Sequence, residues 1–140
     1  MFNNILLAVD GSEHALNAAR TASQLTRTLN SAELRIVVVY DSVPPFLGEP
    51  NFQSAVNSRL DEAQEILRWA EEAIGDIPSS VHTELIAGDP AESIIEVAKT
   101  RKSDLIVMGS RGLGRLAGLV LGSTSQKVVS HAPCPVLIVR

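Results

Sequence analysis

Short apolar runs that alternate with helix-like segments constrain the fold of this chain more than any other feature. Five such runs occur, over residues 4–10, 34–40, 83–87, 104–109 and 135–139. Most are continuously apolar, which is typical of strands covered on both faces of a parallel sheet. Strands that alternate with helices throughout a chain predict an α/β fold. We therefore expect a doubly wound, Rossmann-like sheet of five parallel strands in the order 3-2-1-4-5, with helices on both faces.

Four segments between the runs carry helix signals. Small apolar residues recur at helical spacing after Ser12, which is a favoured N-cap residue. A long amphipathic pattern covers 56–74, and an Asp-Pro pair opens a third helix over about 90–102. A last helix is expected over 123–131, before a proline. No internal repeat, linker or low-complexity tract interrupts this pattern, so we expect a single domain over 1–140.

The composition excludes several classes of function. The net charge is −4 and the aromatics are three Phe, one Trp and one Tyr, which argues against a binder of nucleic acid. Cys134 is the single cysteine, so a disulfide framework and a Cys-rich metal site are excluded. No run of about 18 apolar residues occurs, so we expect no membrane insertion. The N-terminus lacks the pattern of a secretory signal, so we expect a cytoplasmic protein.

Charge is distributed unevenly along the chain. All sixteen Asp and Glu residues lie at or before Asp104, where they outnumber eight Lys and Arg. The segment that follows has no acidic residue and four basic ones, Arg111, Arg115, Lys127 and Arg140. Chance clustering in a short segment is one interpretation. The other is that this C-terminal quarter binds an anion.

Glycines and hydroxyl residues concentrate where the first and fourth strands are expected to end. Ligands of doubly wound sheets bind outside the carboxyl ends of the strands at the point where the strand order reverses. The sequence places Asp10-Gly-Ser after strand one and a glycine-rich stretch, 109–125, after strand four. Glycines let the backbone approach an anion, and a helix start supplies unpaired N–H groups. The hydroxyls of Ser123, Thr124 or Ser125 could add donors, although glycines can serve only turns and Ser123 only a helix cap.

Two partial matches in this stretch, to the dinucleotide-binding fingerprint and to the P-loop, each lack a residue that the full motif requires. Residues 112–117 match the dinucleotide fingerprint G-x-G-x-x-A, but no acidic residue follows them to bind a ribose, so we treat the match as a coincidence. Residues 118–123 resemble part of a P-loop but lack the Lys-Ser/Thr pair after the last glycine. A P-loop ATPase is therefore excluded.

The spacing of Gly109, Gly112 and Gly122-Ser123 resembles the ATP-binding signature of the universal stress protein family, G-x2-G-x9-G-S/T. The opening run that ends at Asp10-Gly-Ser also resembles that family, as do Gly-Asp-Pro at 88–90 and the closing Pro-Cys-Pro-Val-Leu-Ile-Val. The resemblance covers essentially the whole chain, and every position of the signature matches. It implies membership of the branch of the family that binds ATP.

The resemblance implies a role for each matching position. Asp10 would face the ribose, or a Mg²⁺ on the phosphates that it holds indirectly. Val39 or Tyr40 would meet adenine through the main chain, which requires no particular side chain. The residues expected to bind nucleotide follow the strand ends and the glycine-rich stretch: Ala8, Val9, Asp10, Val39, Tyr40, Met108, Gly109, Arg111, Gly112, Gly122, Ser123, Thr124 and Ser125.

The resemblance also implies a homodimer through the last strand, 136–139, and a regulatory role in the stress response. An unpaired apolar edge strand is unfavourable in a monomer, which agrees with a dimer. Hydrolysis is expected to be slow or absent, because Asp10 is the only carboxylate of the two crevice loops and the three histidines are scattered. The alternatives are a non-nucleotide dimeric or chaperone-like interaction protein, a binder of AMP or cyclic AMP, and a weak ATPase or autophosphorylating protein.

Overall fold

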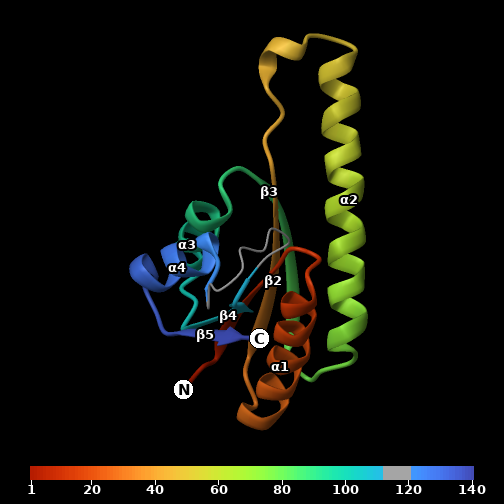
Figure 1. The fold of residues 1–140 in the computed structure, drawn as a ribbon. Coiled ribbons are helices and arrows are strands. Elements are labelled where there is room, and N and C mark those ends of the chain that lie inside the picture. Colours follow the sequence, from red (N-terminus) through yellow and green to blue (C-terminus); the bar gives the residue numbers. More distant parts are fainter. Residues whose placement is uncertain (112–120) are drawn as a thin grey trace.

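The computed structural model describes residues 1–111 and 121–140, and its centre is one parallel sheet (Figure 1). The strands lie in the order β3-β2-β1-β4-β5, and each neighbouring pair is parallel. The predicted fold class and strand order are confirmed. The strand bounds are β1 Asn4–Val9, β2 Glu33–Tyr40, β3 Ser80–Ala87, β4 Leu105–Gly109 and β5 Val136–Val139.

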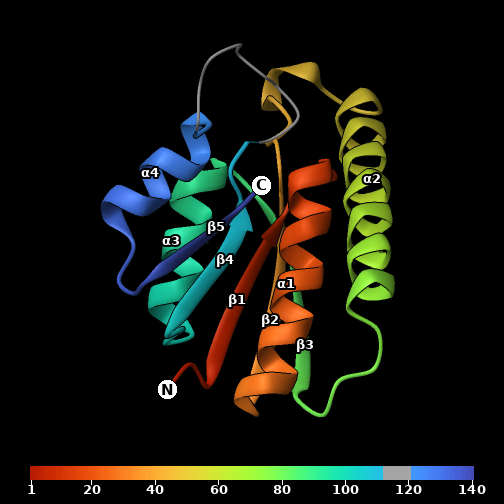
Figure 2. The ribbon, with the colours of Figure 1, turned by 60° about the horizontal axis from the view of Figure 1, so that its bottom comes forward.

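Helices cover both faces of this sheet (Figure 2). α1 (Glu13–Leu29) and α2 (Asn51–Ile74) pack on one face, whereas α3 (Pro90–Thr100) and α4 (Ser123–His131) pack on the other. A short 3-10 helix, η1 (Pro45–Leu47), precedes α2. Within the described part of the chain, no helix combines the length and apolar character needed to cross a membrane.

Alternate residues of the central strand β1 point into two separate apolar cores. Ile5 and Leu7 pack with α1 and α2, whereas Leu6 and Ala8 pack with α3 and α4. Ile5, Leu6 and Leu7 are at most 1% exposed, so both faces of the strand are covered. This two-sided burial explains why the first run is continuously apolar.

Two elements begin earlier than the apolar pattern predicts. α2 begins at Asn51 rather than near residue 56, and none of its first twelve residues is buried. These turns project beyond the sheet beside η1 (Figure 1), so no core contact imposes an apolar period on them. β3 begins at Ser80 rather than Thr83, because its exposed first residues still pair through the backbone with β2, from Glu33 onward.

In the described part of the chain, the helices that follow β1 and β4 lie on opposite faces of the sheet. After β1 the chain enters α1 on one face, whereas α4, the first helix after β4 in the described chain, packs on the other face. The ends of β1 and β4 are adjacent, since Ala8 pairs with Met108. Helices that follow adjacent strands on opposite faces leave a crevice at the carboxyl ends of those strands, where ligands of doubly wound sheets bind.

Candidate functional site

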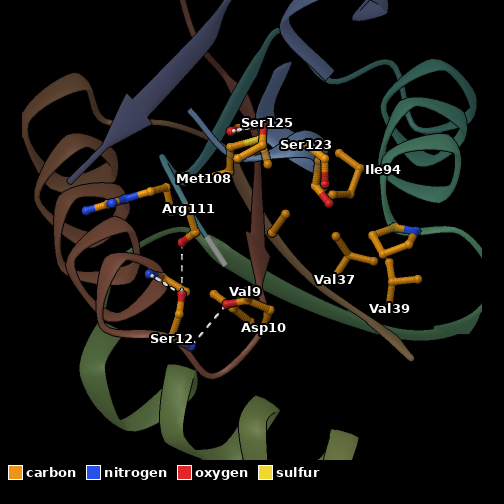
Figure 3. Close-up of a pocket in the computed structure, with 16 residues that line it drawn as sticks. Val9, Asp10, Ser12, Val37, Val39, Ile94, Met108, Arg111, Ser123 and Ser125 are labelled. Atoms are coloured by element: carbon orange, nitrogen blue, oxygen red, sulfur yellow. Dashed lines mark hydrogen bonds between the residues drawn. The ribbon is translucent and has the colours of Figure 1, made fainter. Parts of the chain in front are cut away.

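A cavity of about 280 Å³ opens at the carboxyl ends of β1 and β4 (Figure 3). This volume is near the lower end of the range for small-molecule sites. Eleven of the thirteen residues expected to bind nucleotide line it: Ala8, Val9, Asp10, Val39, Met108, Gly109, Arg111, Gly122, Ser123, Thr124 and Ser125. Five lining residues were not expected: Ser12, Ala15, Val37, Pro90 and Ile94.

The two other expected residues are not in the described wall. Tyr40 packs with the core between the sheet and the helices α1 and α2, whereas Val39 packs on the opposite face and lines the cavity. This difference arises because successive side chains of a strand point to opposite faces. Gly112 lies outside the described residues.

An apolar wall forms one part of the cavity. Val37 and Val39 of β2 lie near Ile94 of α3, on the side of the cavity away from Arg111 (Figure 3). The two-residue period of a strand predicts Val37 once Val39 is placed in the site. Ile94 and Pro90, one helical turn apart, line the cavity because α3 packs on the sheet, and no local sequence signal specifies this packing.

β2 extends beyond the end of β1 and presents main-chain groups to this apolar wall. Pairing between the two strands ends at Val9 with Val38, whereas β2 continues to Tyr40. The Tyr40 carbonyl accepts the N–H of Gly88 on the β3 side, at 2.9 Å. Because consecutive residues of a strand direct their main-chain groups to opposite neighbours, the Val39 carbonyl points to the β1 side, beyond the last pair. It therefore offers an acceptor at the edge of the apolar wall.

The start of α4 forms a second part of the wall. Its N-cap position is Gly122, with φ −77° and ψ 171°, and no described side chain caps the helix. By contrast, side chains cap α1 and α3. The N–H groups of Ser123, Thr124 and Ser125 have no acceptor within a helix that begins there. These donors and the positive end of the helix dipole suit an anion.

The Ser125 hydroxyl serves the protein rather than the cavity. Its Oγ donates to the carbonyl oxygens of Ser110 at 2.7 Å and Gly122 at 3.1 Å, and the residue is 2% exposed. Ser125 could therefore bind an anion only through its backbone N–H group. Ser123 and Thr124 make no side-chain hydrogen bond to a described residue, so their hydroxyls can still donate to a ligand.

Asp10 holds the turn between β1 and α1. Its Oδ1 accepts the N–H of Ser12 at 3.0 Å, and Gly11 between them has a φ of 86°, in the region that favours glycine. Ser12, not Asp10, caps α1, since its Oγ accepts the N–H of Ala15 at 3.2 Å. Within the described chain, the Asp10 Oδ2 makes no hydrogen bond and can meet a ligand.

Basic side chains contribute less to the cavity than the charge distribution predicts. The guanidinium of Arg111 points toward α1 and away from Ile94 (Figure 3), and its carbonyl accepts the Ser12 hydroxyl at 3.5 Å. Lys127 pairs with Asp89 at 3.7 Å and with Glu92, joining α4 to α3. Arg115 lies outside the described residues. The positive field in the described wall therefore comes mainly from helix N-termini.

Metal and cysteine chemistry have little support in this site. Among the described residues, no group of three or more His, Cys, Asp or Glu could hold a metal ion. Cys134 packs with the core between the sheet and the helices α3 and α4. Burial, and secondarily the Asp104 carboxylate, raise the pKa of its thiol, so it is a poor nucleophile at neutral pH.

A cavity at the point where the strand order reverses defines this chain as a doubly wound α/β protein with the ligand site usual for that class. Comparison with known proteins narrows the class. The chain matches the universal stress protein family over residues 1–140, and it belongs to that family. It is 48% identical to a universal stress protein of Thermus aquaticus over 140 residues, which cover all of both chains.

Solved structures of the family share the fold. The universal stress protein UspA from Lactobacillus plantarum is 28% identical, with a TM-score of 0.87 over 99% of this chain and 98% of its own. A universal stress protein solved in complex with cAMP is 25% identical, with a TM-score of 0.67 over 99% of this chain and 97% of its own.

Proposed function

We propose that this chain binds ATP in the crevice between β1 and β4 and acts as a regulatory protein of the cytoplasmic stress response. The observation that carries the proposal is one cavity that combines an apolar wall with the uncapped start of α4. Membership of the universal stress protein family supports it. A relative solved with cAMP supports an adenine nucleotide as the class of ligand.

Adenine suits the apolar wall. Its rings would pack against Val37 and Val39 of β2 and Ile94 of α3. The Val39 carbonyl would accept a hydrogen bond from the 6-amino group. A 6-oxo purine would place an oxygen against that carbonyl, leaving both acceptors unpaired at a cost of about 1–3 kcal/mol. We expect ATP to bind about 5- to 160-fold more tightly than ITP, measured by competition of each nucleotide with a fluorescent ATP analogue.

The phosphates would lie at the start of α4. The N–H groups of Ser123, Thr124 and Ser125 and the hydroxyls of the first two residues would donate to phosphate oxygens. Asp10 would face the ribose or hold Mg²⁺ through water, a role that one carboxylate can fill because Mg²⁺ takes most of its ligands from phosphates and water. The donor set therefore fits a magnesium nucleotide, and Mg²⁺ would neutralise phosphate charge.

Hydrolysis by this site would be slow or absent. Efficient phosphoryl transfer needs a residue that orients water and a cation that stabilises the leaving charge. In the described wall Asp10 is the single carboxylate, no lysine or histidine occurs, and the Arg111 guanidinium points away. A weak ATPase would release phosphate in a magnesium-dependent manner, and an Asp10→Ala variant would lose that release.

The edge strand β5 supports a homodimer. Its four residues, Val136–Val139, are all only half-buried, although each is a β-branched or leucine side chain. A second copy that pairs along this edge would cover them and satisfy the free strand edge. Sedimentation velocity at micromolar concentration would give a dimer, and a strictly monomeric protein would contradict this assembly.

A Gly122→Val variant tests the site. The backbone of Gly122 is extended, so valine can adopt its conformation, and the substitution adds bulk at a residue that lines the cavity. We expect an unchanged thermal unfolding midpoint and the loss of ATP binding in isothermal titration calorimetry. Equal ATP affinity in the variant would contradict the site.

Cyclic AMP is a second candidate ligand, favoured by the relative solved with it and by a cradle that can hold a single phosphate. Calorimetric titrations with ATP, AMP and cAMP under one set of conditions rank the three. A dimeric, chaperone-like protein that uses no nucleotide would bind none of them, and no nucleotide would be released when the freshly purified protein is denatured and chromatographed.

A further inference from the structure

Ser110 joins several of the elements that surround the start of α4, although it does not line the cavity. It follows β4 directly and is 1% exposed. Its N–H donates to the Val139 carbonyl of β5 at 2.8 Å. Its carbonyl accepts two hydrogen bonds from α4, from the Gly122 N–H at 2.7 Å and the Ser125 hydroxyl at 2.7 Å. The first turn of α4 is therefore fixed on the Ser110 peptide.

The side chain of Ser110 is fixed in turn by α1. Its Oγ lies 2.7 Å from Nδ1 of His14, a hydrogen bond whose donor depends on the histidine tautomer. The two elements approach closely here, because a Cβ on Gly109 would lie only 2.8 Å from the Cβ of His14. His14 does not line the cavity either. One buried hydroxyl thus joins His14 of α1 to the residue whose carbonyl holds the first turn of α4.

We propose that Ser110 and His14 are positioning residues that set the start of α4 for the phosphates of the bound nucleotide. This inference rests on the proposed ATP-binding function. Loss of the hydroxyl removes one of the contacts that hold the Ser110 peptide against α1, and the carbonyl that binds Gly122 and Ser125 can then shift with the first turn of α4. The apolar wall does not depend on this bond, because β2 and α3 form it. Binding of the phosphates is therefore weakened selectively, while binding of the base is kept.

The test compares ATP with adenosine in single variants of the full chain. ATP affinity is measured by isothermal titration calorimetry, and adenosine affinity by ligand-observed NMR. We expect Ser110→Ala and His14→Ala each to weaken ATP binding about tenfold, the effect of one lost buried hydrogen bond, with adenosine affinity unchanged. The double variant should be no weaker than either single one, because both remove the same bond. His14→Asn keeps a polar atom at the δ position and should restore most of the ATP affinity.

Ser23→Ala is the matched control. Ser23 is also a buried serine, and its Oγ donates to the Ile74 carbonyl at 2.7 Å, between α1 and α2 and outside the cavity lining. This variant should lose thermal stability as Ser110→Ala does but keep wild-type affinity for ATP. A general loss of stability is thereby separated from the loss of positioning.

Each outcome decides the inference. Parallel losses of ATP and adenosine affinity, unchanged ATP affinity in Ser110→Ala, or an equal loss of ATP affinity in Ser23→Ala would each overturn the positioning role and leave the proposed function standing. A wild-type protein that binds neither ATP nor any other adenine nucleotide would overturn the proposed function, and this inference with it.

Discussion

Gly109, the first glycine of the signature, is required by the packing of α1 on β4 in addition to its place in the cavity wall. A Cβ built on Gly109 would lie 2.8 Å from the Cβ and 2.9 Å from the carbonyl carbon of His14, and 3.0 Å from the nitrogen of Ala15. These atoms belong to the first turn of α1 or are fixed to it, so no flexible side chain can move aside. Gly109→Ala should therefore destabilise the protein without any ligand.

The expected loss in the free energy of unfolding is about 3 kcal/mol, the upper part of the usual range for overpacking, because three such contacts must all relax together. An unfolding entropy of about 2.1 cal/mol/K per residue gives about 0.3 kcal/mol/K for a chain of 140 residues, so the midpoint of thermal unfolding should fall by about 10 °C. Urea denaturation followed by circular dichroism measures the free energy, and scanning calorimetry measures the midpoint. Both use nucleotide-free protein.

Gly122→Ala is the matched control, since the last glycine of the signature already has an extended backbone, with φ −77°, that alanine can adopt. It should change the free energy of unfolding by at most about 1 kcal/mol, because the preference for glycine over alanine at an N-cap is offset by the restriction that alanine places on the unfolded chain. His14→Ala should not rescue Gly109→Ala, because the Cβ and the backbone atoms of the clash remain. A Gly109→Ala protein as stable as wild type without nucleotide would refute the packing argument and leave only ligand approach to explain this glycine.

Two further predictions concern local structure. Ser12→Ala removes the cap of α1 and should cost about 1 kcal/mol of unfolding free energy in urea denaturation, and Ser12→Asp should recover most of it; no loss in the alanine variant would contradict the capping role. The raised pKa of Cys134 keeps its thiol protonated, so iodoacetamide should alkylate the native protein at pH 7.5 more slowly than a model cysteine peptide. The rate should rise with pH beyond the range where the peptide reaches its plateau, and a plateau at lower pH than the peptide's would contradict a raised pKa.

The strand order and fold class could be predicted from the sequence because the central strands are buried on both faces and are therefore apolar at nearly every position. β1 reads as a continuous apolar run because Leu6 and Leu7 face different cores. The start of β3 could not be predicted in this way, since its first residues are exposed and only backbone pairing with β2 defines them. The start of α2 is likewise formed without a buried residue.

Site residues at the strand ends and in the glycine signature could be predicted from the sequence. Site residues that reach the cavity only through packing of distant elements could not. The glycine spacing and the strand ends give most of the cavity wall, as Asp10 and Ser123 illustrate. Ile94 enters the wall only because α3 packs over the sheet. The hydrogen bond between His14 and Ser110 joins residues 96 positions apart, so no local spacing in the sequence could indicate it. For the same reason the sequence alone could not show that the Arg111 guanidinium points away from the cavity.

The proposed ATP site is tested by isothermal titration calorimetry. Nucleotide-free wild type and the Gly122→Val variant are each titrated with ATP under the same conditions. We expect saturable binding of one ATP per chain by the wild type, and no detectable binding by a Gly122→Val protein that unfolds at the same temperature. Wild-type protein that binds no ATP, or a variant that binds it with unchanged affinity, would contradict an ATP site between β1 and β4.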